Sequence, residues 1–227
     1  MNFSIIVPIA ANKKEYNSQM PSVFKLNDRG VSRCVEAVLK LYLDNVDAIY
    51  FTILKQHDEQ YGIKNLLQLQ IDRLALPNAK IVVLDEPTSC QAETVFETIK
   101  KENITGPIFI KDADCSFTAD VMVHNGVVVY PIENLKSVNP QHKSYVAVDD
   151  QLYITNIIEK KVIDHYFNAG GYMFEDADNF VSYYMMLAQY DNLYLSHMIY
   201  AMLLDGYVFR PFIADEYTDF DVIKTVK

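Results

Sequence analysis

The stretch KIVVLDEPTSCQAETVFETIKKENITGPIFIKDAD, residues 80–114, decides the fold class of this 227-residue chain. It contains a β-branched strand at Lys80–Leu84, a helix pattern over Gln91–Glu102 and a second apolar strand at Pro107–Ile110. Pro87 separates the first strand from the helix. This strand–helix–strand order is typical of a parallel sheet whose crossover helices cover its faces.

The residues before this stretch continue the same alternation. Phe3–Pro8 and Ala48–Leu54 are short apolar runs that predict buried strands. Val31–Asn45 and Tyr61–Leu74 carry apolar residues at helical spacing. Strands and helices therefore alternate as far as Ile110, which predicts a largely parallel, doubly wound sheet.

The second half of the chain no longer shows this regular alternation of strands and helices. We expect four further strands and two helices there: Gly126–Tyr130, Ser144–Val148, Gln151–Ile158, Asn168–Phe174, Asp176–Ala188 and Tyr194–Leu204. Asp149-Asp150 predicts a hairpin turn between the second and third of these strands. The whole pattern predicts one domain over residues 1–227, a three-layer, Rossmann-like α/β fold. Its central sheet is mostly parallel and carries an inserted antiparallel hairpin.

Composition excludes several classes of protein. Half of the residues are apolar, so a packed core is expected, and the net charge of −10 argues against binding to a nucleic-acid backbone. None of the 7 glycines precedes Gly30, which removes a Walker loop or a GxGxxG fingerprint from the first strand–helix turn. Cys34, Cys90 and Cys115 are widely spaced, so neither a disulfide framework nor a zinc motif is indicated.

The sequence also guides expectations on location and assembly. No stretch approaches the roughly 20 apolar residues of a membrane span. The apolar run near the N-terminus precedes the basic residues Lys13 and Lys14, the reverse of a secretory signal. We therefore expect a cytoplasmic protein without a membrane span, and a homodimer is compatible with the sequence.

Two acidic residues follow the fourth predicted strand. Ligands of open α/β sheets bind at the carboxyl ends of the strands, and Asp112 and Asp114 lie at such an end. Residues two apart on an extended backbone point the same way, so the two carboxylates converge and repel unless a cation neutralises them. Mg²⁺ or Mn²⁺, completed by substrate phosphates, suits this pair. An exposed acidic loop or a helix cap remains the alternative.

Three other segments could contribute to the same site. The helix start Gln91–Thr94 offers amide groups and side-chain donors to an anionic or heterocyclic ligand. Glu159 could accept hydrogen bonds from sugar hydroxyls, Lys160 could meet a phosphate, and the Gly170–Gly171 pair permits close backbone approach. Taken singly, each is better explained as a surface charge or a turn. Their order along one chain is the informative feature.

That order resembles the sugar nucleotidyltransferases of the glycosyltransferase-A-like fold, which make nucleoside diphosphate sugars from a nucleoside triphosphate and a sugar 1-phosphate. The likeness is greatest to small members from capsule and lipopolysaccharide clusters, which act in polysaccharide biosynthesis. It covers most of residues 1–225 and is best from Lys80 to Phe174. The segments that carry it are VLDEPTSCQAETV (83–95), FIKDADC (109–115), VAVDDQLYITNIIEKK (146–161), FNAGGYMF (167–174) and YTDFD (217–221).

The resemblance implies a role for each matching position. Asp112, Asp114 and Asp219 would hold Mg²⁺ or Mn²⁺. The nucleotide would contact Ala10, Ala11, Gln91, Thr94 and Asp112, with Gln91 facing the base. Glu159, Lys160, Asn168 and Gly170 would line the sugar-phosphate pocket, and Lys25 and Lys160 would serve catalysis.

The first loop departs from the family pattern of G-x-G-x-R followed by P-K. Here residues 9–26 read IAANKKEYNSQMPSVFKL, with no glycine, with Glu15 near the arginine position and with Ser22 after the proline. A glycine-free backbone wraps a triphosphate less closely, and a carboxylate in place of arginine repels it. Lysines could supply positive charge from another geometry, or could be solvated loop residues: Lys13, Lys14 and Lys25.

Three functions remain open at this stage. The first is nucleotidyl transfer, in which an acceptor phosphate attacks the α-phosphorus of the triphosphate in line and expels pyrophosphate. The second is glycosyl transfer from a nucleoside diphosphate sugar, which needs no triphosphate loop but does need a general base. Candidates for that base are Asp164, Asp215 and Asp219. The third is a non-catalytic relative that binds nucleotide or sugar.

Overall fold

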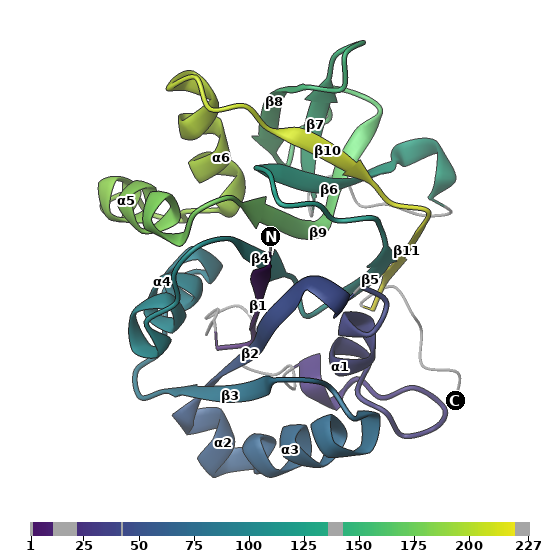
Figure 1. The fold of residues 1–227 in the computed structure, drawn as a ribbon, viewed down its shortest axis with the longest axis vertical. Helices are drawn as coiled ribbons and strands as arrows, with labels where there is room; N and C mark the ends of the chain where they lie inside the picture. The colour runs from purple at the N-terminus through teal and green to yellow at the C-terminus, as the bar shows by residue number, and fades with distance from the viewer. Residues whose placement is uncertain (1, 11–21, 42, 136–142, 221–227) are drawn as a thin grey trace.

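The computed structural model describes residues 2–10, 22–41, 43–135 and 143–220. One mixed sheet runs through these residues, and helices cover both of its faces (Figure 1). Four neighbouring strands are parallel and lie in the order β3-β2-β1-β4. Their bounds are β1 Phe3–Pro8, β2 Val46–Leu54, β3 Ala79–Leu84 and β4 Ile108–Lys111, which confirms the four strands predicted for the first half.

The rest of the sheet is built around β9 (Tyr166–Phe174), which pairs antiparallel with β4 on one side and with β6 (Gly126–Pro131) on the other. A further strand, β10 (Arg210–Ile213), adds in parallel to β6. The predicted hairpin is present as β7 (Ser144–Val148) and β8 (Ile154–Glu159), and β7 also pairs with β9. The predicted mostly parallel α/β sheet with an inserted hairpin is therefore confirmed.

Side-chain alternation along the strands gives each face of the sheet its own core. In β1, Ile6 packs into one core, while Phe3, Ile5 and Val7 pack into the other. Helices α4 (Gln91–Glu102), α5 (Ala177–Leu187) and α6 (Leu195–Leu204) bury residues in the first core. Helices α1 (Arg33–Val38) and α3 (Ile63–Leu74) bury residues in the second. The result is the expected three-layer arrangement.

Two predicted helices differ from the structure. The Tyr61–Leu74 pattern is divided at Gly62, whose φ of +67° ends α2 (Lys55–Tyr61) and starts α3. The Val31–Asn45 pattern forms a helix only as far as Val38. After that residue the backbone amides bond to carbonyls three residues back, which tightens the chain into a turn before the short 3₁₀ helix η3 (Leu43–Asn45) and β2.

A small second sheet was not predicted. Strand β5 (Cys115–Thr118) follows β4 directly and pairs antiparallel with β11 (Glu216–Asp219), which places Asp219 opposite Cys115. This pairing brings the C-terminal acidic segment to the turn that carries Asp112 and Asp114. Two further 3₁₀ helices, η2 (Ser22–Phe24) and η4 (Ile132–Asn134), lie in connecting segments. Among the described helices, none has the length and apolar character to cross a bilayer.

Candidate active site

Three segments that are distant in the sequence meet at the carboxyl end of β4. The half-buried Asp112 accepts a hydrogen bond at Oδ1 from the Gln91 Nε2 amide, 2.5 Å away. Its backbone amide donates to the carbonyl oxygen of Gly170 at 2.8 Å. The start of α4, the end of β4 and the middle of β9 therefore form one surface, as the order of motifs led us to expect.

Gly170 makes this contact sterically feasible. Its φ is +87°, and a Cβ added there would lie 2.7 Å from Cys115 Sγ and 2.8 Å from Asp112 Oδ2. Its amide donates to Oδ1 of the buried Asn168 at 2.8 Å. Only glycine satisfies both the left-handed backbone and the close approach of the carboxylate.

A buried lysine holds the turn between β4 and β5. The Lys111 side chain is fully buried, and its ammonium donates to the carbonyl oxygens of Asp112 at 2.7 Å and Cys115 at 2.8 Å, and to Cys115 Sγ at 3.3 Å. Sequence reasoning did not assign Lys111 a role. The available signal was a lysine that ends an apolar strand immediately before the acidic pair.

The electrostatic environment leaves Asp112 short of positive charge. Burial, and then the nearby charge of Asp114, raise the pKa of Asp112 to about 6, although Lys111, the Gln91 hydrogen bond and Lys143 act in the opposite direction. Burial also raises the pKa of the Cys115 thiol to about 12. That thiol donates to the Ala169 carbonyl at 3.1 Å, so it is a structural group and not an activated nucleophile.

The third predicted metal ligand, Asp219, forms an ion pair in this structure. Its Oδ2 accepts from the Lys143 ammonium at 2.7 Å, and both side chains are 20% exposed. The same ammonium donates to the Tyr217 hydroxyl oxygen at 2.5 Å. The amide of Phe220 donates to the Asp114 carbonyl at 2.8 Å, which fixes this segment beside the acidic turn.

Lys143 is a charged residue of this site that the sequence did not indicate. It lies just before β7, in a polar segment without a recognisable motif. Burial lowers the pKa of Lys143, but the hydrogen bond and charge of Asp219, with smaller contributions from Cys115 and Asp114, raise it further, so the net pKa lies above its ordinary value. Lys143 is therefore a protonated ammonium at neutral pH.

The acidic residues form no preassembled metal cage. Within the described ranges, no group of three His, Cys, Asp or Glu side chains is placed to hold a metal ion. Asp112 and the exposed Asp114 nevertheless offer hard oxygen donors, and the raised pKa of Asp112 is the sign of a carboxylate that a cation would stabilise. A Mg²⁺ ion commonly takes only one or two carboxylates plus phosphates, so the pair fits an ion shared with a substrate.

At the end of β8, the predicted sugar-binding residues are bonded to neighbouring side chains. Glu159 Oε2 accepts from the Ser144 hydroxyl at 2.5 Å and from the Ser196 hydroxyl at 2.8 Å. The exposed Lys160 donates to the Tyr194 hydroxyl at 2.7 Å, with its ammonium 4.8 Å from the ring centroid. The start of α6 therefore supplies one partner to each residue, and the start of β7 supplies a second partner to Glu159.

The remaining predicted positions are placed as follows. Ala10, after β1, and Thr94, in α4, are both completely buried, and the Thr94 hydroxyl is 2.6 Å from that of Thr88. Lys25 is half-buried, directly after η2. Ala11, Lys13, Lys14 and Glu15 lie outside the described residues.

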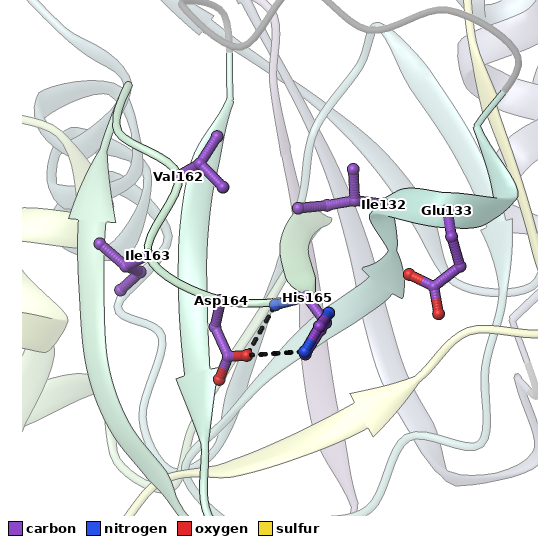
Figure 2. Close-up of a pocket in the computed structure, with 6 residues that line it drawn as sticks. All are labelled: Ile132, Glu133, Val162, Ile163, Asp164 and His165. Atoms are coloured by element: carbon purple, nitrogen blue, oxygen red, sulfur yellow. Dashed lines mark hydrogen bonds and ion pairs between the residues drawn. The ribbon is translucent and has the colours of Figure 1, made fainter.

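Asp164, a candidate general base for glycosyl transfer, lines an open surface pocket between η4 and the β8–β9 loop (Figure 2). Its Oδ1 accepts from the backbone amide of His165 at 2.7 Å, and its Oδ2 accepts from the amide of Val148 at 3.2 Å. Ile132, Val162 and Ile163 give the pocket an apolar wall. Both Asp164 oxygens thus accept hydrogen bonds from backbone amides, one in the loop and one at the end of β7. Asp215 is exposed.

Comparison with solved structures finds the same fold in proteins described as pyrophosphorylases and as a CTP transferase. An inositol-1-phosphate CTP transferase from T. maritima superimposes with a TM-score of 0.72 and 16% identity, covering 97% of this chain and 89% of that one. A nucleoside-diphosphate-sugar pyrophosphorylase from Vibrio cholerae gives 0.69 and 16%, covering 92% and 91%. A UDP-glucose pyrophosphorylase complexed with UDP-glucose gives 0.65 and 11%, covering 97% and 94%.

Comparison at the level of sequence does not identify a family for this chain. No family model matches the sequence, and no curated protein matches it significantly. At identities of 11–16%, the structural similarity establishes the shared fold over nearly the whole chain. What those proteins bind or transform does not pass to this chain by fold alone.

Proposed function

We propose that this protein is a nucleotidyltransferase that moves a nucleoside monophosphate from a nucleoside triphosphate to a sugar 1-phosphate or similar phosphorylated acceptor, releasing pyrophosphate. One observation carries the proposal. Gln91, Asp112 and Gly170 meet at the carboxyl end of β4, in a fold shared with a nucleoside-diphosphate-sugar pyrophosphorylase and a CTP transferase. A carboxylate with a raised pKa at this position is typical of a functional site.

The predicted roles are distributed around this point. Gln91, with the backbone near Ala10, faces the nucleotide base, while Glu159, Lys160 and Asn168 bind the acceptor. Asp112 and Asp114 would hold a Mg²⁺ or Mn²⁺ ion, which when bound neutralises phosphate charge. Asp219 remains a predicted ligand, although it is paired with Lys143 in this structure.

The proposed reaction requires positioning more than proton transfer. The acceptor phosphate is already ionised at neutral pH, so its oxygen can attack the α-phosphorus without a general base. Donor groups that align the two phosphates in line, and cations that offset their repulsion, provide the catalysis. The polar groups around Asp112 and Lys143 are suited to this task. Burial raises the pKa values of the Cys34 and Cys115 thiols, so neither of these two is activated for covalent chemistry.

Glycosyl transfer is less well supported. It needs a carboxylate free to accept a proton from an acceptor hydroxyl. Both oxygens of Asp164 accept backbone hydrogen bonds, and Asp219 is bonded to Lys143 and Tyr217. Asp215 is exposed and lies at the opposite end of the β5–β11 pair from Asp219, where its backbone amide donates to the Thr118 carbonyl. A non-catalytic binding protein remains the outcome to expect if binding occurs without turnover.

Pyrophosphate release tests the proposal. The native protein is incubated with Mg²⁺ or Mn²⁺, each common nucleoside triphosphate and a panel of sugar and polyol phosphates. We expect pyrophosphate to be released only when one particular nucleoside triphosphate and one particular acceptor are both present. D112N should lower the rate by about 100-fold, in line with losing a ligand of the ion that neutralises the reacting phosphates. D120N, which removes an exposed carboxylate nearby in the sequence, should retain native activity.

A thermal-shift panel separates the alternatives. Stabilisation by a triphosphate supports nucleotidyl transfer, whereas stabilisation by UDP or GDP with Mn²⁺, but by no triphosphate, supports glycosyl transfer. No pyrophosphate release by folded protein with any pair would contradict the proposal. The cytoplasmic location and the homodimer stay predictions from the sequence.

A further inference from the structure

Lys143 comes from a third region of the chain to the edge of the acidic turn. It precedes β7, whereas Asp112 and Asp114 follow β4, and Asp219 ends β11. Its ammonium lies 5.1 Å from the Tyr217 ring centroid and 5.9 Å from that of Phe167. The contact with Tyr217 is made through the hydroxyl at the edge of its ring, so the bonds to Asp219 and the Tyr217 hydroxyl, with the Phe167 ring nearby, hold the cation.

The two lysines near the acidic turn use their hydrogen-bond donors differently. Lys111 is fully buried, and its ammonium donates to three protein acceptors. Lys143 is 20% exposed, and its bonds to Asp219 and Tyr217 use two of its three donors. In the part of the chain that the structure describes, no other acceptor takes the third donor. Lys143 thus presents an oriented, partly exposed positive charge.

We propose that Lys143 is a phosphate-binding residue of this site, oriented by Asp219 and Tyr217, for the pyrophosphate part of a nucleoside triphosphate. The inference rests on the proposed function, because it takes the carboxyl end of β4 as the place of the reacting phosphates. Asp112 and Asp114 already make this turn acidic, so a polyphosphate needs a cation supplied by the protein as well as any bound ion. The glycine-free first loop offers no arginine for this purpose.

The alternative is that Lys143 only neutralises Asp219. A purely structural ion pair affects stability without affecting the affinity for a phosphate ligand. The two roles therefore differ in a measurable way, and the measurement does not depend on turnover.

The experiment is isothermal titration of inorganic pyrophosphate into the native protein, K143M, K143R and K64M, with and without Mg²⁺. K64M removes the same charge from the exposed Lys64 of α3. We expect K143M to weaken binding by about tenfold or more, as for a lost charge-assisted hydrogen bond. K143R, which keeps the charge, should stay within about threefold of native, and K64M should equal native.

In K143M, Asp219 loses the ammonium partner of its ion pair, and the loss of that partner destabilises the fold. The double variant K143M/D219N is therefore measured too. It removes both charges of the pair, and we expect it to unfold near the native temperature and still bind pyrophosphate weakly. Native affinity in folded K143M or in the double variant would overturn the proposal, as would a native protein that does not bind pyrophosphate at about 1 mM. Pyrophosphate binding that depends on Lys143, without any pyrophosphate release from substrates, would support this inference and contradict the proposed function.

Discussion

The ends of β4 and β8 carry the same kinds of residues but use them differently. At the end of β4, Asp112 is partly buried beside Asp114, and its raised pKa shows that the surrounding groups do not balance its charge. At the end of β8, two serine hydroxyls bond Glu159, and the Tyr194 hydroxyl bonds Lys160. The first end is prepared for a cationic or polar ligand. At the second end, a ligand must compete with hydroxyl groups that are already bonded.

The largest expected effect is steric and lies at the end of β4. G170A places a Cβ within 2.9 Å of three atoms in a left-handed backbone, so we expect a loss of about 2–5 kcal/mol in the free energy of unfolding. G206A is the matched control. Gly206 has the same φ of +87° with nothing within 4 Å, so only the backbone cost of about 1 kcal/mol applies. Urea denaturation measures both, and equal losses would contradict a close approach of Asp112.

A smaller effect is expected at the end of β8. S196A removes one of the two hydroxyl donors to Glu159, which should cost about 1 kcal/mol because the buried partner is lost while Ser144 remains. S182A is the control. Ser182 is exposed on α5 and donates only to the Asp178 carbonyl, so its loss should stay within about 0.5 kcal/mol. If the two variants unfold at the same urea concentration, the hydroxyls do not hold Glu159.

The smallest effect is a pH dependence that belongs to the end of β4. The pKa of Asp112 is about 6 in the folded protein and 3.8 as the ordinary value, so the folded state binds more protons between these values. This group therefore makes the free energy of unfolding fall as pH rises through that window, and it contributes its full destabilisation above pH 6.

D112N carries no titrating carboxyl and should lose that dependence. The difference in melting temperature between D112N and native protein should shift in favour of D112N from pH 3.5 to pH 7, by a margin that solvent screening keeps small. D120N, at an exposed position, controls for the loss of a charge. A difference in melting temperature that stays constant over this pH range would show that the pKa of Asp112 is not raised in the folded protein.

Sequence patterns predicted the fold where strands are long or bounded by clear breakers. Phe3–Pro8 was predicted with its observed bounds, because a run of buried β-branched residues ends there at a proline. Strands β5, β10 and β11 were missed, because each has four residues and none shows a clear alternation. Their pairing is set by contacts between distant segments, such as Asp219 with Cys115, which local periodicity does not encode.

The site was predictable in outline for the same reason. Gln91 begins a recognisable helix, Asp112 follows a recognisable strand, and Gly170 belongs to a glycine pair within another strand; the fold brings the three together. Lys143 precedes a strand in a polar segment, and only the tertiary structure places it against Asp219. The sequence does not show which motif residues are buried either. Thr94 matches the family motif, but it is buried and its hydroxyl bonds to that of Thr88.

The two-sided pairing of β9 has a consequence for insertions and deletions. Asn168, Gly170 and Tyr172 share one face of this strand, and Ala169 and Met173 pack on the other. Sliding β9 by a single residue against β4 would exchange these faces, and a slide in one of the two directions would bring Ala169 to the position that only glycine fits. Changes in chain length are therefore tolerable in the loop between Lys160 and His165, whereas one residue gained or lost within β9 would misalign both halves of the sheet at once.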